Sequence, residues 1–371
     1  MDERFKCEVI FARALKVTEV FPMTKTDHNA LRFKTDTVTA QFINPKGEVV
    51  DHLTEIRTNP VTHRTCRITY SRINEKEAGA KFLPKPPPNA ENIENCPFCK
   101  PQISHLTPKL PLSKFRHERL FEGESILFPN LFPYGSYSAV SLFDNRHFVE
   151  IGTADIASYT NGFVNCANYL KQIRSHDLKA AFVAITQNHL PSAGGSLLHP
   201  HLQVYADHLA SNNHRMLSTC ADAYHKQTGN LIYQDYLKHE LTDGSRTIGQ
   251  TGDWRWLAAF APEGFFEIWG ILPGKFSISQ VKKEEWTALA QGVINAQRFF
   301  RSLNRNGYNL GLLAIENEES KLELRISLIV RSNYAPWVRN DHTGFEVMLF
   351  DMATFTAPEM TAQMARPFWQ I

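Results

Sequence analysis

The feature that most constrains this chain is a nine-residue run at 196–204, which reads Ser-Leu-Leu-His-Pro-His-Leu-Gln-Val. Side chains along a β-strand alternate between its two faces with a period of two. His199, His201 and Gln203 would therefore share one face, while Leu202 and Val204 would lie on the other. A strand with three polar groups on one side and apolar residues on the reverse predicts a polar site on a buried sheet.

A glycine-containing loop directly upstream of this strand suggests what the site binds. The loop includes Asn188, Gly194 and Ser196. Glycine lets backbone N–H groups approach a phosphate closely, and a serine hydroxyl adds another donor. A neutral histidine beside a phosphate can attack phosphorus when a backbone carbonyl holds its other ring nitrogen. The competing interpretation is that the histidines are only hydrogen-bonded structural residues, but the complete run favours a catalytic site.

The hydrophobic pattern divides the chain into two halves, each with strands, one long helix and more strands. Helices are predicted over 157–176 and 284–303, where apolar residues recur with helical spacing. The strands that follow them are predicted at 180–186, 198–206, 310–315 and 322–330. A last helix is expected to begin at Pro358. This order predicts an α+β fold with an internal duplication. We place the boundary between residues 1–208 and 209–371, with the connection in the polar segment 207–253.

Composition narrows the class of protein. The chain has 371 residues, of which 43% are hydrophobic and 21% charged, as in an ordinary globular protein. Its net charge of +2 gives no electrostatic basis for binding nucleic acid, although one nucleotide could still be held in a pocket. The N-terminal segment has no continuous apolar stretch, and no run reaches the length of a membrane span. We therefore expect a soluble, cytoplasmic protein of about two domains.

Two of the six cysteines lie close together, at Cys96 and Cys99, in the sequence Cys-Pro-Phe-Cys. In a chain without a disulfide framework, this spacing is typical of half a zinc site or of a redox pair. A structural zinc site needs four ligands. The sequence therefore predicts that further ligands come from elsewhere in the chain.

The run Ser-x-x-His-Pro-His-x-Gln, preceded by Asn188 and Gly194, resembles the active-site motif of galactose-1-phosphate uridylyltransferases. These enzymes form the transferase branch of the histidine-triad superfamily. Further segments resemble the same family: 59–62 with Arg72, 96–99, 128–133, 266–267 with 272–273, and 345–346 with Pro358, Glu359 and Arg366. Residues 1–56 and about 207–255 match nothing in it. The resemblance implies two histidine-triad-type domains in tandem, with an antiparallel sheet and helices.

The resemblance also implies roles for individual residues. His201 would be the nucleophile that accepts a nucleoside monophosphate from a nucleotide sugar, with a second phosphate as the later acceptor. Gln203 stands where a hydrolase of the same superfamily would carry a third histidine. Glutamine cannot act as a general acid or base, which suits a nucleotidyl-histidine intermediate that waits for this acceptor. The remaining nucleotide- and phosphate-binding residues would be Arg72, Asn130, Phe132, Asn188, Gly194 and Ser196.

The implied metal is Zn²⁺, held by Cys96, Cys99 and His199. The fourth ligand is left open between Asp155 and His147, or the site is incomplete. Some family members bind another metal through a His-x-His on a late strand of the second half. The matching strand here, 324–330, has no histidine, so we expect that second site to be absent.

Two positions near the C-terminus, 346 and 352, bear on which sugar the protein would use. Glu346 would bind a sugar hydroxyl, but Met352 stands where members that act on galactose 1-phosphate carry a glutamine. The base could be uridine or adenosine. The main hypothesis is nucleotidyl transfer from a nucleotide sugar to a sugar 1-phosphate, by a homodimer. The alternatives are a nucleotide-sugar phosphorylase, with inorganic phosphate as acceptor, and a zinc-stabilised nucleotide-binding protein without turnover.

Overall fold

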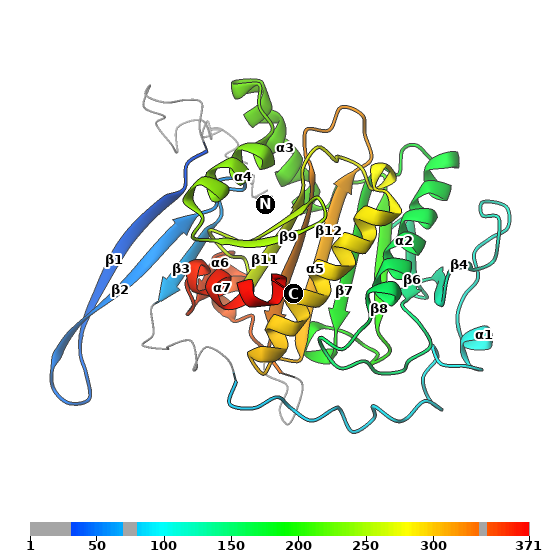
Figure 1. The fold of residues 1–371 in the computed structure, drawn as a ribbon, viewed down its shortest axis with the longest axis horizontal. Helices are drawn as coiled ribbons and strands as arrows, with labels where there is room; N and C mark the ends of the chain where they lie inside the picture. The colour runs from blue at the N-terminus through cyan, green and yellow to red at the C-terminus, as the bar shows by residue number, and fades with distance from the viewer. Residues whose placement is uncertain (1–30, 70–79, 334–339, 371) are drawn as a thin grey trace, which may run out of the picture.

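The computed structural model describes residues 31–69, 80–333 and 340–370. Its body is a ten-stranded antiparallel sheet with the order β4-β5-β6-β8-β7-β12-β13-β11-β10-β9 (Figure 1). The strands are β4 Leu120–Glu122, β5 Ser125–Pro129, β6 Tyr137–Leu142, β7 Phe182–His189, β8 His201–Asp207, β9 Thr247–Thr251, β10 Trp254–Ala258, β11 Phe265–Leu272, β12 Gly307–Ile315 and β13 Leu324–Arg331. The predicted α+β fold with an antiparallel sheet is confirmed.

The two halves of the sheet have the same topology. Read inward from one edge, the order is β4-β5-β6-β8-β7, and read inward from the other it is β9-β10-β11-β13-β12. In each half the long helix follows the third strand: α2 (Ile156–His176) follows β6, and α5 (Lys283–Ser302) follows β11. The halves join where β7 pairs with β12 in antiparallel register. This repeated order accounts for the duplication seen in the sequence pattern, while the exact division at residues 208 and 209 stays a prediction.

The helices α2 and α5 lie together across one face of the sheet and bury the main core against it (Figure 1). Asp155 caps the N-terminus of helix α2, where its carboxylate accepts a hydrogen bond from the Ser158 amide at 2.8 Å. Helix α5 approaches the sheet closely at Gly292, where an added Cβ would lie 2.0 Å from the Trp256 ring. Any side chain at this position would therefore displace the buried tryptophan.

The polar segment 207–253 differs from the prediction of a simple connection. It forms α3 (Asn212–Thr228) and α4 (Ile232–Asp243), followed by β9. Their few apolar residues, including Leu217, Tyr233 and Tyr236, gather in a second core cluster with Trp269 on the side of the sheet away from α2 and α5. The remaining helix surface is largely polar, which explains why the sequence looked like a linker.

A four-stranded sheet, ordered β1-β2-β3-β14, lies beside the second half. Strands β1 (Lys34–Ile43) and β2 (Val49–Thr58) form a hairpin that projects from the body, and β3 (Thr65–Thr69) pairs in parallel with β14 (Met352–Thr354). The remaining elements are α1 Ile103–Leu106, α6 Gly344–Leu349, α7 Pro358–Ala365 and the short 3₁₀ turns Pro191–Ala193, Ile278–Gln280 and Arg366–Trp369. Helix α7 begins at Pro358, as predicted.

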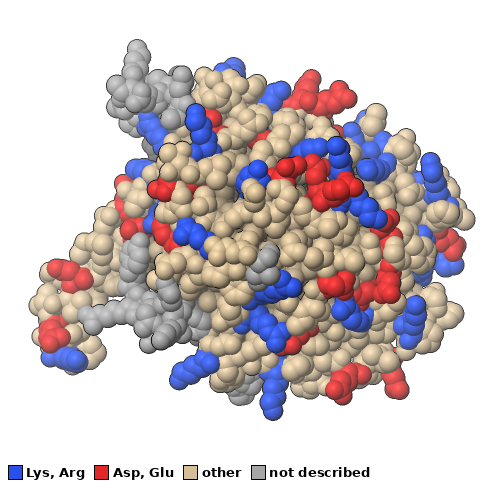
Figure 2. All heavy atoms as spheres, in the orientation of Figure 1, with Lys and Arg blue, Asp and Glu red and all other residues tan. Residues whose placement is uncertain are grey.

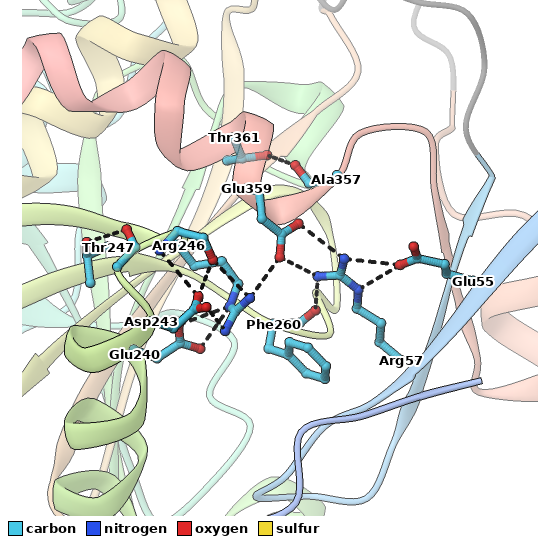
Figure 3. Close-up of polar contacts among 12 residues, drawn as sticks. Glu55, Arg57, Glu240, Asp243, Arg246, Thr247, Phe260, Ala357, Glu359 and Thr361 are labelled. Atoms are coloured by element: carbon cyan, nitrogen blue, oxygen red, sulfur yellow. Dashed lines mark hydrogen bonds and ion pairs between the residues drawn. The ribbon is translucent and has the colours of Figure 1, made fainter. Parts of the chain in front are cut away.

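A chain of ion pairs joins the small sheet to the helices (Figure 3). Glu359 of α7 accepts from Arg57 of β2 at 2.8 Å and from Arg246 at 2.8 Å, and Arg246 also contacts Glu240 of α4 at 3.0 Å. Burial alone would raise the pKa of Glu359, but its bonds to the two arginines lower it overall. The network therefore holds an ionised carboxylate between two nearly buried guanidinium groups.

We expect Glu359→Ala to lower the free energy of unfolding by about 1–3 kcal/mol near neutral pH, because two buried cations lose an acceptor. Since the pKa of Glu359 is lowered in the folded state, its stabilisation is present above the ordinary value of 4.5 and disappears as the pH falls. Denaturant unfolding at several pH values should show the wild type and the variant converging in acid. Glu122→Ala, which removes an exposed ion pair with Lys283, is the matched control and should leave the free energy of unfolding nearly unchanged. A gap that persists at low pH would contradict the assignment.

On the face drawn in Figure 2, acidic and basic side chains are interspersed, so no large patch carries charge of one sign. None of the helices in the described part of the chain has both the length and the apolar character needed to cross a bilayer.

Candidate functional site

His201 stands at the start of β8, on the face of the sheet away from α2 and α5, and its side chain is largely buried. Its Nδ1 lies 2.8 Å from the backbone carbonyl oxygen of His199. A carbonyl can only accept, so Nδ1 carries the proton and Nε2 keeps a free lone pair. Burial lowers the pKa of His201 more than this hydrogen bond raises it. The imidazole is therefore held neutral, in the tautomer that leaves Nε2 nucleophilic.

Gln203 follows His201 on the same face of β8, as the alternation predicted. Its Oε1 accepts a hydrogen bond from the Tyr205 hydroxyl at 2.8 Å. On β7, the neighbouring strand, Asn188 Oδ1 accepts from Asn309 Nδ2 at 2.6 Å. In both amides the acceptor atom is occupied, and no described residue accepts from either NH₂ group. Two amide donors are thus left on the face that carries His201, which suits the oxygens of a phosphoryl group.

The loop between the two strands differs in part from the expectation of free backbone donors. The amides of Ala193, Gly194 and Gly195 bond to carbonyls of Leu190 and Pro191 within the turn, so they do not face a ligand. Ser196 is exposed, and no hydrogen bond to its side chain is present among the described residues. An added Cβ at Gly195 would lie 2.8 Å from the Asn188 carbonyl oxygen. The loop therefore contributes close packing and one serine hydroxyl instead of an amide cradle.

The predicted base-binding residues lie at the end of β5. Asn130 bonds through its backbone amide to Ser138 of the neighbouring strand, and its Oδ1 accepts from the Phe132 amide at 3.2 Å. Phe132 has 75% of its surface exposed. Strand β5 is separated from β8 only by β6. The structure thus places an exposed aromatic ring after the second strand away from the strand of His201.

The remaining predicted residues are not gathered around His201. Arg72 lies outside the described residues. The Glu346 carboxylate accepts from the backbone and side chain of Thr343, where it caps α6. Met352 is only 6% exposed and packs in the apolar cluster beside Cys66. Among the described residues, no hydrogen bond joins Glu346 to His201 or Gln203.

Cys96, Cys99, His147 and His199 form a compact cluster in which all four ligand atoms lie within 4.8 Å of one another. The Nδ1 atoms of His147 and His199 are 3.3 Å and 3.5 Å from Cys99 Sγ, and His199 Nδ1 is 3.9 Å from Cys96 Sγ. Of the two candidates for the fourth ligand, His147 lies in the cluster. Asp155 instead caps α2 and pairs with Arg146.

The donor set of this cluster fits a tetrahedral zinc ion. Ligand atoms about 2.0–2.3 Å from zinc lie about 3.5 Å from one another at tetrahedral angles, close to the spacing found here. Each histidine also turns its Nε2 to a backbone carbonyl, His199 to Asp144 at 3.1 Å and His147 to Asn89 at 3.2 Å. Such bonds leave the Nδ1 lone pairs directed at the cluster, as in metal sites. A metal bound there would fix His199, whose backbone carbonyl accepts the hydrogen bond from His201 Nδ1.

Two residues at this site escaped prediction. Tyr205 continues the alternation of His201 and Gln203 by one step, so the strand period alone could have identified it. Asn309 lies in the second half and meets Asn188 only through the pairing of β7 with β12. No local signal in the sequence indicates that register.

Comparison with known proteins places this geometry among related folds. No protein-family model matches the chain. A protein of Archaeoglobus fulgidus, described only as uncharacterized, is 27% identical over 327 residues, which cover 87% of this chain and 94% of that protein.

Solved structures match the fold over most of the chain. An ADP-glucose phosphorylase from Arabidopsis thaliana, with bound ADP-glucose, superposes with a TM-score of 0.66 at 18% identity, covering 84% of this chain and 98% of that one. A GalT-like protein from the same plant gives 0.64 at 18% identity, with the same coverage. A uridylyltransferase gives 0.62 at 17% identity, covering 85% and 98%. The resemblance inferred from the histidine motif is thus confirmed at the level of structure, and the chain has the GalT-like fold.

Proposed function

We propose that this protein is a nucleotidyltransferase that moves a nucleoside monophosphate from a nucleotide sugar to a sugar 1-phosphate. The observation that carries the proposal is the donor arrangement on one face of β7 and β8. A neutral imidazole presents Nε2, and the amides of Gln203 and Asn188 present only donors. This combination suits attack on a phosphorus atom whose oxygens carry negative charge.

The reaction would proceed in two balanced steps. First, His201 Nε2 attacks the α-phosphorus, forming a P–N bond and breaking the bond to the bridging oxygen, so that sugar 1-phosphate leaves with the electron pair. Second, a phosphate oxygen of the acceptor attacks the same phosphorus and the P–N bond breaks, which regenerates the imidazole. The amides of Gln203 and Asn188 and the hydroxyl of Ser196 would stabilise the charge on the phosphoryl oxygens in both steps.

We further propose that Zn²⁺ is held by Cys96, Cys99, His147 and His199. When bound, it supplies structural cross-linking and no catalytic chemistry, because four protein ligands leave no open position. The ring of His199 would be fixed by the metal, and the backbone carbonyl of the same residue holds His201 Nδ1. The position of the nucleophile would therefore depend on the integrity of the metal site.

Incubation of the pure protein with ADP-glucose or UDP-glucose, labelled in the nucleotide, tests the proposal. The expected result is one protein-bound nucleoside monophosphate per chain, with one equivalent of glucose 1-phosphate released. Both nucleotide sugars are tried because the sequence is compatible with either uridine or adenosine. A structure of similar fold contains ADP-glucose. Nucleotide binding without release of glucose 1-phosphate from either substrate would instead support a non-catalytic binding protein.

A phosphorylase, with inorganic phosphate as acceptor, is the second candidate. The observation that favours it is the state of two residues expected to contact the acceptor sugar. Met352 is apolar and buried, and the Glu346 carboxylate is engaged by Thr343. Inorganic phosphate makes no demand on sugar-binding residues.

We accordingly expect galactose 1-phosphate not to be the best acceptor. A sugar hydroxyl that lacks a partner costs about 1–3 kcal/mol, which corresponds to a loss of roughly fivefold to 150-fold in kcat/KM. The measurement mixes the nucleotide-loaded protein with inorganic phosphate, glucose 1-phosphate and galactose 1-phosphate and compares the rates of discharge. Discharge that is fastest with galactose 1-phosphate by a wide margin would show that the loss of the glutamine has no consequence.

A further inference from the structure

Asn309, in the second half of the chain, makes direct contact with the candidate phosphoryl site of the first half. It lies opposite Asn188 in the β7–β12 register. Its Nδ2 donates to Asn188 Oδ1 at 2.6 Å and to the Ala193 carbonyl at 2.8 Å. Both protons of the Asn309 amide are thus used, one on a site residue and one on the loop before Ser196.

The orientation of the Asn309 amide is fixed from its other side. Its Oδ1 accepts from Arg331 Nη1 at 2.7 Å. Arg331 is in turn held by Asp341, with Nε and Nη2 at 2.7–3.0 Å from the carboxylate oxygens. Turning the amide over would place its NH₂ against the guanidinium and its oxygen against two acceptors. Only one orientation satisfies every group.

This fixed amide decides which end of Asn188 can face a ligand. Because Asn309 donates to Asn188 Oδ1, the Asn188 NH₂ group is the end left without an acceptor among the described residues. An amide that turned its oxygen toward a phosphoryl group would instead repel it. We propose that Asn309 is a positioning residue for nucleotidyl transfer, which acts through Asn188 and is itself held by Arg331 and Asp341. The inference rests on the proposed function, and it makes the second half of the chain part of the site.

A double-mutant cycle between Asn309→Ala and Asn188→Ala tests this dependence. The readout is the single-turnover rate of adduct formation from labelled nucleotide sugar, measured over substrate concentration so that the maximal rate and the apparent affinity are separated. We expect Asn188→Ala to lower the maximal rate about a hundredfold, as for loss of one donor to a developing oxyanion. Asn309→Ala should lower it about tenfold, and the double variant should be no slower than Asn188→Ala alone. Asn168→Ala, on α2 across the sheet, is the control and should be unaffected.

Asn309→Asp separates positioning from simple stabilisation. A carboxylate keeps an acceptor for Arg331, so the fold should be retained, although the melting temperature should fall because the second carboxylate oxygen faces the Ala193 carbonyl. It offers no proton to Asn188 Oδ1, so Asn188 would turn its NH₂ group away from the site. We expect Asn309→Asp to be at least as slow as Asn309→Ala, whereas a purely structural role predicts that aspartate restores the rate.

The outcomes are distinct. Multiplicative losses in the double variant, a normal rate for Asn309→Ala, or rescue by aspartate would each overturn the positioning role while the wild-type adduct still forms. Absence of an adduct in the wild type with every nucleotide sugar tried would overturn the proposed function, and this inference with it.

Discussion

Replacement of His201 by alanine should abolish nucleotide transfer. The imidazole Nε2 is the only group that the proposed first step uses as a nucleophile, and neither Gln203 nor Asn188 can replace it. Removal of a nucleophile of this kind lowers turnover by about four orders of magnitude or more. The labelled adduct should disappear, and the wild-type adduct should be labile in acid, as a P–N bond to histidine is. Digestion of the labelled wild-type protein should place the nucleotide on the peptide that contains residue 201.

The fold should survive this substitution. His201 lies on the site face of the sheet, and its ring meets the edge of Phe98 without belonging to either main core cluster. The melting temperature should therefore remain close to that of the wild type. His208→Ala, one residue beyond the far end of β8 and exposed, is the matched control and should transfer nucleotide normally. An adduct found on a cysteine or serine, or one that persists in His201→Ala, would show that the nucleophile is misassigned.

The sequence was most informative where a pattern is local. The long helices at 156–176 and 283–302 have a sustained apolar repeat, and the face shared by His201 and Gln203 follows from strand alternation alone. The pair Cys96 and Cys99 indicates a metal site because its spacing is itself the signal.

Features that depend on contacts between residues far apart in the sequence could not be predicted in the same way. The choice of His147 over Asp155 is made by the course of the loop before α2, which brings one side chain to the cysteines and commits the other to a helix cap. The contact of Asn309 with Asn188 depends on the register of two strands more than a hundred residues apart. The segment 207–253 looked like a linker because its apolar residues are few and become a recognisable face only against Trp269.

Replacement of Cys96 by serine should remove about one zinc ion per chain and destabilise the protein. Such a site is assembled only in the folded state, so the free energy of metal binding contributes directly to folding. Loss of even 3 kcal/mol would lower Tm by about 6–12 °C on the scale for domains of 150–250 residues. Zinc content by atomic emission and Tm by calorimetry are the measurements. Cys220→Ser is the matched control, because this free cysteine on α3 is not part of the cluster.

The identity of the fourth zinc ligand can be tested by comparing variants of His147 and Asp155. His147→Ala should lose zinc as Cys96→Ser does, since its Nδ1 lies 3.3 Å from Cys99 Sγ. Asp155→Ala should keep zinc and lose only the helix cap and an exposed ion pair with Arg146, at a cost of about 1–2 kcal/mol. Because the His199 carbonyl positions His201, the zinc-free variants should also form the nucleotide adduct more slowly, while Asp155→Ala should not. A wild-type protein that binds no zinc and loses no stability when treated with a chelator would refute the structural role of the cluster, and it would leave the assignment of His201 standing on its own geometry.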